Sequence, residues 1–512
     1  MSNWRLIIRV IGILLFIESG LLLACFIVGI CYDEPARYAF LWPMIIAWMI
    51  GMMNQCVGHR SSLNMSRKDG YMIVSIVWVI FSLIGMLPFI ISGAVPDVSS
   101  AFFETMSGFT STGATIIDNC DAQPYCILFW RSITQWIGGV GIIFFTVAIL
   151  PAFGVGEVKL FAAESTGPFR NKVHPRISVA VRWIGSIYVG LTLSCFSALL
   201  LCGVEVFDAF NYALTITATG GYSPHSALIR DLFNSPTIEY VMIMFMILAG
   251  INYTLLYMTL LKGHFRNFLK DAELRCFFYI FGGATLVCTI VLMTQELWGV
   301  ESFSELLERV ELAFRDSLFT VVSLQTTTGL SNCDYTQWPM PCMPLLLFIM
   351  FAGACSGSTS SGFKCVRWSL IYRITRNEFT RILHPRAVLP VKYNGQVVSN
   401  QVVRTLFGFC ALFIGSLLVG AFVLAFAGVD PYYASVNADF NPNLDFDFYD
   451  ALGLSLSSIS NVGPGMDYYG PMHSWSILSP VAKVTCSVLM LIGRLEIFPV
   501  FVLFTRNFWK RT

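Results

Sequence analysis

The stretch Phe109-Thr110-Ser111-Thr112-Gly113-Ala114 recurs three more times in the chain, each time between long apolar runs. The later copies read Ile216-Thr217-Ala218-Thr219-Gly220-Gly221, Gln325-Thr326-Thr327-Thr328-Gly329-Leu330 and Ile459-Ser460-Asn461-Val462-Gly463-Pro464. Aligned on Gly113, Gly220, Gly329 and Gly463, successive copies lie 107, 109 and 134 positions apart. A stretch that returns at a long, nearly regular spacing indicates one structural unit used repeatedly.

Each copy ends a short amphipathic run that cannot cross a bilayer. These runs begin near Ser99, Phe207, Leu312 and Asp447 and have about 12 residues, whereas a spanning helix needs about 20. Backbone that stops at bilayer depth is tolerated only where it lines water or is buried in protein. Four such ends around one axis would form a ring of carbonyl oxygens that replaces the hydration shell of a cation.

The glycine in each copy suits this arrangement because glycine permits the φ angles that turn a carbonyl inward. A single Thr-Gly pair is typical of an ordinary turn, but four copies in phase favour an ion filter. The predicted cation filter comprises Ser111, Thr112, Gly113, Ala218, Thr219, Gly220, Thr327, Thr328, Gly329, Asn461, Val462 and Gly463.

The composition is that of an integral membrane protein. Of the 512 residues, 56% are apolar and 12% are charged, against about 25% charged residues in soluble domains. The net charge of +1 gives no indication of nucleic-acid binding. The cysteines lie mostly in apolar runs and are interpreted as buried apolar residues. Cys120 with Cys126, or Cys333 with Cys342, could pair if their loops face an oxidising side.

Ten spanning helices are predicted from apolar runs of sufficient length. The first is longer than the apolar core of a signal peptide and is therefore expected to be retained. The predicted spans are 8–31, 38–57, 71–92, 125–150, 180–203, 236–261, 276–299, 340–377, 404–428 and 474–507. The resulting domains are an accessory two-helix hairpin, 1–60, and four pore units, 61–155, 156–265, 266–395 and 396–512.

Basic residues indicate the orientation. With the N-terminus placed in the cytoplasm, 25 of the 32 Lys and Arg residues fall on the inner side, as the positive-inside rule requires. Both termini are therefore expected to be cytoplasmic. The acidic stretch that contains Asp430, Asp439, Asp445, Asp447 and Asp450 is either an ordinary solvated loop or a funnel that concentrates cations.

A polar interruption in the third unit suggests a gate. Residues 353–362 carry three glycines and several hydroxyl side chains at bilayer depth, so we expect a loop that is buried or lines a cavity. A helix-packing face of small residues is the alternative. The predicted gate comprises Gly353, Gly357, Ser358, Thr359, Ser360, Gly362 and Arg494.

Two basic residues lie within the last apolar run. A charge at bilayer depth costs about 2.5–3.5 kcal/mol or more and usually has a role. Arg494 is predicted to form a barrier beside the pore, or alternatively a structural pair with Glu496 or another carboxylate. Lys483 is either a second charge beside the pore or a side chain that reaches the outer interface.

The chain carries no His-Glu-x-x-His, Gly-x-Ser-x-Gly or phosphate-loop motif, so an enzyme is not favoured. A membrane enzyme or a structural subunit remains a distant alternative. The transport hypotheses are a cation pore driven by membrane potential and, as runner-up, an H⁺- or Na⁺-coupled symporter.

The chain resembles the Trk/Ktr/HKT superfamily of potassium transporters, in particular its TrkH branch. Besides the fourfold stretch, the resemblance rests on Trp130-Arg131-Ser132, Gln135-Trp136-Ile137-Gly138-Gly139, Gly357-Ser358-Thr359-Ser360 and Gly493-Arg494-Leu495-Glu496-Ile497-Phe498-Pro499. It covers nearly the whole chain, and the additional N-terminal hairpin is typical of the TrkH branch.

This resemblance implies an all-α membrane protein in which four helix–pore loop–helix repeats surround one pore. It implies a homodimer in the bacterial inner membrane, no cofactor other than transported K⁺, and gating by a cytosolic nucleotide-binding, TrkA-like subunit. In that superfamily the filter glycines match Gly113, Gly220, Gly329 and Gly463, the gating loop matches 353–362, and the pore-facing arginine matches Arg494. Relatives that prefer sodium often carry Ser at the first filter glycine, so Gly113 favours potassium.

Overall fold

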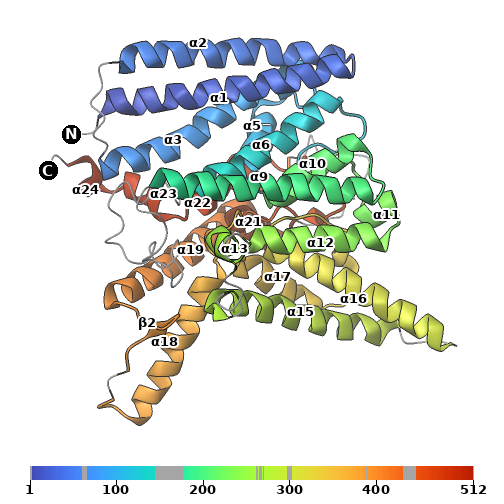
Figure 1. Ribbon diagram of the computed structural model, residues 1–512, viewed down its shortest axis with the longest axis vertical. Coiled ribbons are helices and arrows are strands. Elements are labelled where there is room, and N and C mark those ends of the chain that lie inside the picture. The colour runs from blue at the N-terminus through green and yellow to red at the C-terminus, as the bar shows by residue number, and fades with distance from the viewer. Residues whose placement is uncertain are drawn as a thin grey trace.

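The computed structural model describes residues 3–59, 66–144, 177–260, 263, 268, 270–296, 302–387, 389–430 and 446–510. This part of the chain is mostly helical, and its named strands form one two-stranded sheet. The long helices run roughly parallel to one another, and α18 (Cys365–Leu383) projects away from them (Figure 1).

An N-terminal pair of helices forms one side of the molecule. Helix α1 (Trp4–Cys31) begins at Asn3, whose side chain accepts a hydrogen bond from the Leu6 N–H. The 3-10 helix η1 (Pro35–Phe40) leads into α2 (Leu41–Gly58). The two helices approach closely at Gly12 and Gly51, where a Cβ on either residue would lie about 3 Å from the other carbonyl oxygen. Small residues at such a crossing are typical of helix packing in membranes.

Four short helices end at the four polar stretches: α5 (Val98–Phe109), α10 (Val206–Thr217), α16 (Phe303–Gln325) and α21 (Phe448–Ser460). Three of them have 12 or 13 residues, as expected, but α16 has 23. Its first turns form because Ser302 caps the N-terminus by accepting from the Glu305 N–H. The sequence expectation of about 12 residues was therefore wrong for α16.

The remaining helices surround these four. In chain order they are α3 (Arg67–Gly85), α4 (Leu87–Ser92), α6 (Tyr125–Phe144), α9 (Ile177–Leu201), α11 (Ile229–Phe233), α12 (Pro236–Gly250), α13 (Tyr253–Leu260), α15 (Ala272–Glu296), α17 (Cys342–Ala352), α18, α19 (Asn400–Ala427), α22 (Pro480–Arg494), α23 (Phe498–Leu503) and α24 (Arg506–Trp509), with the 3-10 turns η4 (Tyr335–Gln337) and η5 (Asp467–Tyr469). Contacts run in a closed circle: α5 touches α6 and α22, α10 touches α6 and α12, α16 touches α12 and α17, and α21 touches α17 and α22.

Each predicted span coincides with helical structure over its described residues, which exclude 145–150, 261 and 297–299, but three spans are interrupted for two or more residues. Within the described residues, six helices are long and apolar enough to cross a membrane, or seven if the bent pair α12 and α13 counts as one span. That pair bends by 104°, because Asn252 Oδ1 caps a new helix by accepting from Thr254 N–H and Leu255 N–H. The other breaks separate α17 from α18 and α22 from α23.

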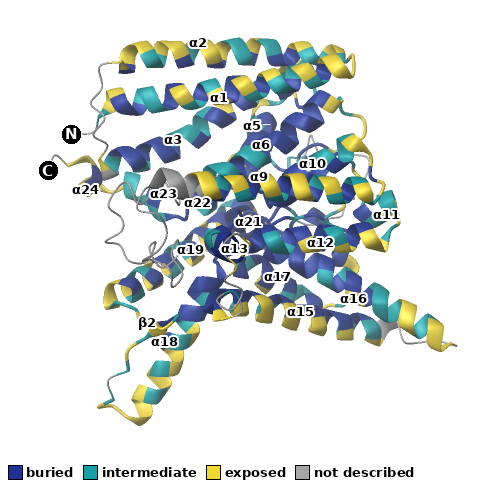
Figure 2. Ribbon diagram, viewed as in Figure 1, coloured by how far each residue is buried: buried dark blue, intermediate teal, exposed yellow. Residues whose placement is uncertain are grey.

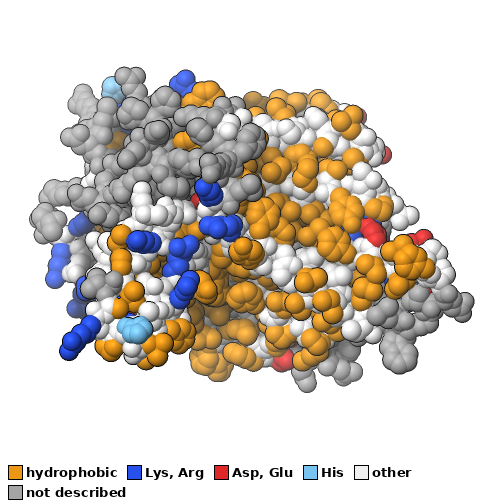
Figure 3. All heavy atoms as spheres, turned by 60° about the horizontal axis from the view of Figure 1, so that its bottom comes forward, with side chains coloured by type: hydrophobic (Ala, Val, Ile, Leu, Met, Phe, Trp, Pro, Cys, Tyr) orange, Lys and Arg blue, Asp and Glu red, His pale blue; other side chains and the backbone are white. Residues whose placement is uncertain are grey.

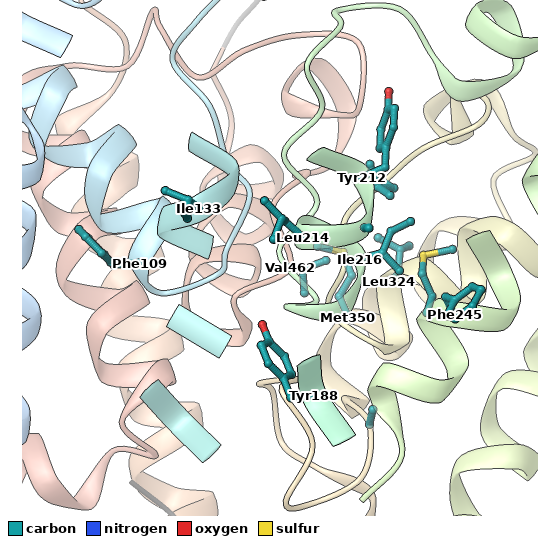
Figure 4. Packing of buried hydrophobic residues seen from close by; sticks show 14 of the residues in the cluster. Phe109, Ile133, Tyr188, Tyr212, Leu214, Ile216, Phe245, Leu324, Met350 and Val462 are labelled. Atoms are coloured by element: carbon teal, nitrogen blue, oxygen red, sulfur yellow. The ribbon is translucent and has the colours of Figure 1, made fainter. Parts of the chain in front are cut away.

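Burial increases toward the centre of the molecule, whereas exposed side chains lie on the outer helices (Figure 2). One large apolar cluster packs around the ends of the short helices; it includes Phe109, Ile216, Leu324 and Val462 (Figure 4). Exposed apolar side chains cover much of one face, and basic side chains gather at one end of it (Figure 3). This distribution fits a protein whose outer surface faces lipid between two aqueous ends.

A small hairpin lies between α18 and α19. Strands β1 (Lys392–Tyr393) and β2 (Gln396–Val397) pair antiparallel, with Tyr393 opposite Gln396. The turn residues Asn394 and Gly395 have φ values of 46° and 82°, as in the type I′ turns that favour Asn-Gly.

Candidate functional site

The four short helices end in the same local geometry. One residue per copy adopts a left-handed conformation, with φ between 51° and 56°: Ser111, Thr219, Thr327 and Asn461. The next N–H donates to the carbonyl five positions earlier at 2.9–3.0 Å; the donors are Thr112, Gly220, Thr328 and Val462. These four residues therefore occupy equivalent positions.

A glycine with positive φ follows in every copy, and each contacts the neighbouring copy. A Cβ on Gly113 would lie 2.1 Å from the Gly220 carbonyl oxygen, and one on Gly221 would lie 1.8 Å from that of Thr328. A Cβ on Gly329 would lie 2.2 Å from the Val462 carbonyl oxygen. A Cβ on Gly463 would lie 2.7 Å from the Thr112 carbonyl oxygen. The contacts pass from the first copy to the fourth and back to the first, so the four turns form a closed ring. No side chain larger than hydrogen fits at these positions without displacing a carbonyl.

The register of the second copy differs from the sequence alignment. The alignment placed Gly220 in phase with Gly113, but Gly221 has the equivalent φ, 77°, and the equivalent contact. Residues Thr219, Gly220 and Gly221 thus match Ser111, Thr112 and Gly113, and Ala218 matches Thr110. The alignment failed because the second copy has two consecutive glycines and a Thr in the position before the first of them.

A cavity of about 140 Å³ opens above the ring and is lined by all four of these glycines. Its other walls come from residues that follow the glycines, including Asp118, His225, His473 and Trp475. A cation that approaches from this side therefore meets the ring directly.

Several buried polar side chains support the ring from behind. Gln135 Nε2 donates to the Gly220 carbonyl at 2.7 Å, and Gln135 Oε1 accepts from the Tyr222 N–H at 3.1 Å. Arg131 forms a buried ion pair with Glu104 at 2.8 Å and donates to the Ser223 carbonyl. The sequence reading did not assign functions to Glu104, Arg131, Gln135 or Tyr222. Signals existed for three of them, because Glu104 and Arg131 are charged residues within runs predicted to lie at bilayer depth, and Arg131 and Gln135 belong to motifs that carry the family resemblance.

The predicted gating segment is a loop rather than a helix, so the alternative of a helix-packing face is wrong. Its predicted members lie between α17 and α18, and all except the half-buried Gly357 are buried. Thr359 Oγ1 donates to the Thr217 carbonyl at 3.1 Å, and the Ser361 N–H donates to Thr327 Oγ1 at 3.1 Å. The loop therefore contacts residues that precede the glycines, on the side of the ring opposite the cavity.

The same loop fills the break between α12 and α13. The Cys355 N–H donates to the Gly250 carbonyl, and the Gly357 carbonyl accepts from the Tyr253 N–H, both at 3.1 Å. These bonds satisfy backbone groups that the 104° bend would otherwise leave unpaired at depth.

Arg494 joins the loop to the ring. Its guanidinium donates to the Thr359 carbonyl at 2.8 Å, the Ser361 hydroxyl at 3.2 Å, the Ser111 hydroxyl at 3.2 Å and the Gly138 carbonyl at 2.8 Å. Within the described residues it makes no ion pair with a carboxylate. The alternative of a pair with Glu496 is thus wrong, since Glu496 instead binds Lys364 and Arg367 at 2.5 and 3.0 Å.

Lys483 lies on α22 and contacts α5. Its side chain is fully buried, and its Nζ donates to Ser100 Oγ, near the start of α5, at 2.9 Å. This contact places Lys483 beside the first copy, and both interpretations of its role stay predictions.

The cysteine pairs considered from the sequence are free thiols in the structure. Cys120 Sγ accepts from Arg131 at 3.3 Å, and Cys333 lies 3.8 Å from Thr320 Oγ1. Of the acidic stretch, Asp439 and Asp445 lie outside the described residues. So do eight of the basic residues counted on the inner side: Arg60, Lys159, Arg170, Lys172, Arg176, Lys262, Arg266 and Arg511.

An ionic clasp joins the loop after the first glycine turn to the loop after the second and to the first turn of α10. His225 lies 2.6 Å from Asp121 and 3.0 Å from Asp208 through its two ring nitrogens. Its hydrogen bonds, first with Asp208, raise the pKa of His225 to about 9. The imidazolium therefore donates to both carboxylates at neutral pH.

Comparisons with known proteins agree with this architecture. Residues 37–511 match a family model described as "TrkH: Cation transport protein". The chain is 33% identical to the Trk system potassium uptake protein TrkH of Escherichia coli K12 over 511 residues, which is 99% of this chain and 100% of that protein. It is 30% identical to TrkG, a second Trk system potassium uptake protein of that strain, over 99% of both chains. The crystal structure of the potassium transporter TrkH from Vibrio parahaemolyticus is similar, with 31% identity, a TM-score of 0.86, and coverage of 99% of this chain and 100% of that one.

Proposed function

The chain belongs to the TrkH family of cation transport proteins, and from this premise we propose that it takes up potassium through the ring of four glycine turns. It is a multi-pass membrane protein and a potassium uptake transporter. The membrane potential supplies about 2.3 kcal/mol per charge per 100 mV, enough to draw a cation inward without ATP.

The observation that carries this proposal is the closed ring of glycine–carbonyl contacts. Because Gly113, Gly221, Gly329 and Gly463 each contact the next copy, the carbonyls of Thr112, Gly220, Thr328 and Val462 are held around one axis. Rigid, convergent carbonyls can replace the hydration shell of K⁺. We assign the filter to these residues together with Ser111, Thr219, Thr327 and Asn461, and the four units to helix–pore loop–helix repeats around one pore.

Loop 353–362 and Arg494 form the gate in this proposal. The loop lies across the inner face of the ring, and the guanidinium places a positive charge beside Ser111 and Thr359. A fixed cation there opposes the passage of another cation. Opening requires the loop to withdraw, which is an order-to-disorder or displacement transition of a kind common in gating elements.

The proposal also covers the orientation of the chain in the membrane and its partner subunits. Basic side chains at one end of the molecule (Figure 3) support cytoplasmic termini in a bacterial inner membrane. We propose a homodimer whose opening is controlled by a cytosolic, nucleotide-binding TrkA-like subunit, because the relatives are named as components of a Trk system.

Rubidium uptake into proteoliposomes tests the transport proposal. We expect uptake to follow an imposed inside-negative potential and to be unchanged by a proton or sodium gradient. Uptake that requires either gradient would instead support the coupled symporter, and no uptake under any condition would contradict potassium transport.

Substitution of the arginine tests the gate. Arg494→Ala removes the charge and the two bonds to loop 353–362, so we expect basal flux to rise about tenfold or more. Arg381→Ala is the matched control, because Arg381 is an exposed arginine paired with Glu378 on α18. Equal flux in the two variants would contradict the gate.

A further inference from the structure

The hairpin β1–β2 is connected to the gating loop by a short chain of side-chain contacts. Asn394 lies in the turn of the hairpin, and its side chain contacts the start of α15. Its Nδ2 donates to Asp271 Oδ2 at 2.9 Å, and its Oδ1 accepts from the Ala272 N–H at 3.0 Å. Two bonds from one side chain fix both its distance and its orientation relative to the helix.

Asp271 in turn organises the first turn of α15. Its other oxygen, Oδ1, accepts from the Glu273 N–H at 2.9 Å and the Leu274 N–H at 3.0 Å, as an N-cap does. Because Asp271 and Glu273 are both buried, these contacts set where the Glu273 carboxylate lies.

Glu273 holds the gating loop directly. Its carboxylate accepts from the Ser356 N–H at 2.5 Å and from the Ser356 hydroxyl at 2.9 Å. Because the two carboxyl oxygens bind the backbone and the side chain of the same residue, they fix the position of Ser356. Within the described residues, Ser356 thus links the loop to α15, whereas Arg494 links it to the ring.

The hairpin is itself packed against α15, α18 and α19. Tyr393 is buried in an apolar cluster with Ala272, Val366 and Leu406, and Arg373 on α18 donates to the Lys392 carbonyl at 2.8 Å. A movement of α18 or the start of α19 would therefore be transmitted to Asn394.

We propose that Asn394 and Asp271 are positioning residues of the gate: they hold Glu273 so that its carboxylate keeps loop 353–362 closed across the ring. This inference rests on the proposed gate and adds a specific path to it. In this inference, a movement of α18 or the start of α19 reaches loop 353–362 through the hairpin and releases the loop.

Asn394→Gly is the decisive variant, because glycine retains the left-handed turn while the two side-chain bonds are lost. In proteoliposomes we expect basal rubidium flux to rise between about twofold and tenfold, the range set by loss of one or two hydrogen bonds. The K⁺/Na⁺ flux ratio should remain that of the parent protein, because the filter is not touched. Gln396→Ala is the control, since Gln396 is an exposed residue of the same hairpin, and its flux should equal that of the parent.

A double variant distinguishes the proposed role of Asn394 from a general loss of structure. Ser356→Ala should also raise basal flux, and its combination with Asn394→Gly should raise it by less than the product of the two separate effects. Asn394→Asp provides a second test if the glycine variant is poorly folded, because Asp tolerates the turn but replaces the donor to Asp271 with an oxygen. Its flux should rise in the same way.

The outcomes distinguish this inference from the gate itself. If Arg494→Ala raises basal flux while both Asn394 variants resemble the parent, the hairpin inference is overturned and the gate stands. If none of these variants changes flux, both are overturned. Independent effects of Asn394→Gly and Ser356→Ala, or a changed ion ratio, would likewise overturn the inference.

Discussion

Because Gly221 rather than Gly220 occupies the position of Gly113 in the second turn, substitutions of these two glycines should have different effects. In Gly221→Ala the new Cβ would lie 1.8 Å from the Thr328 carbonyl oxygen, whereas real Cβ atoms essentially never approach within 3.0 Å. The backbone of one turn must therefore move by more than 1 Å. The left-handed φ of 77° alone costs a non-glycine residue about 1–2 kcal/mol, which reduces the population of an intact ring about fivefold to thirtyfold. The overlap adds to this cost.

Gly220→Ala gives the comparison. Its Cβ would meet the Gln135 side chain at 2.4 Å, and a side chain can change rotamer where a carbonyl of the ring cannot. We expect Gly221→Ala to lose at least about tenfold in rubidium uptake, and Gly220→Ala to lose less. Uptake is measured in proteoliposomes, per folded protein quantified by size-exclusion chromatography. A Gly220→Ala variant that is more impaired than Gly221→Ala would refute the register.

Three further predictions concern other parts of the molecule. Gly113→Ser places a Cβ 2.1 Å from the Gly220 carbonyl oxygen, so the K⁺/Na⁺ flux ratio should fall; an unchanged ratio would count against a filter role for Gly113. Glu496→Gln removes the carboxylate shared by Lys364 and Arg367, so the free energy of unfolding should fall by about 3 kcal/mol, measured by denaturation in detergent, with the exposed Glu378→Gln as an unaffected control. The raised pKa of His225, about 9, means that its clasp stabilises the fold fully below its ordinary pKa of about 6.5 and is lost as pH rises through about 9. His225→Gln should therefore lower the melting temperature at pH 6 but not at pH 10; an equal decrease at both would exclude the ionic clasp.

Much of the architecture could be predicted from local patterns. Apolar runs located the long helices, and the polar stretch located the ends of α5, α10, α16 and α21, because both signals are contained within about 20 consecutive residues. The loop at 353–362 was also predictable, since three glycines and several hydroxyl residues cannot continue a buried helix there.

What the sequence could not provide depends on contacts between distant segments. The choice between Gly220 and Gly221 is decided by the Thr328 carbonyl, which lies 107 positions beyond Gly221. The break at Asn252 depends on residues of loop 353–362, which bind backbone groups on both sides of it. Glu496 looked like a partner for Arg494 by proximity in sequence, yet tertiary packing directs it to Lys364 and Arg367.

The hairpin β1–β2 could also be predicted from a local signal in the sequence. Asn394-Gly395 is the strongest dipeptide indication of a tight hairpin, but it lies in a basic segment that was interpreted only by charge. Its importance for the loop emerges from the contact with Asp271, which no pattern in the sequence predicts.

Anomalous scattering from bound thallium or rubidium ions tests the central claim most directly. We predict a peak on the axis of the four turns, surrounded by the carbonyl oxygens of Thr112, Gly220, Thr328 and Val462. Peaks confined to other parts of the protein, with none inside the ring, would contradict potassium passage through it.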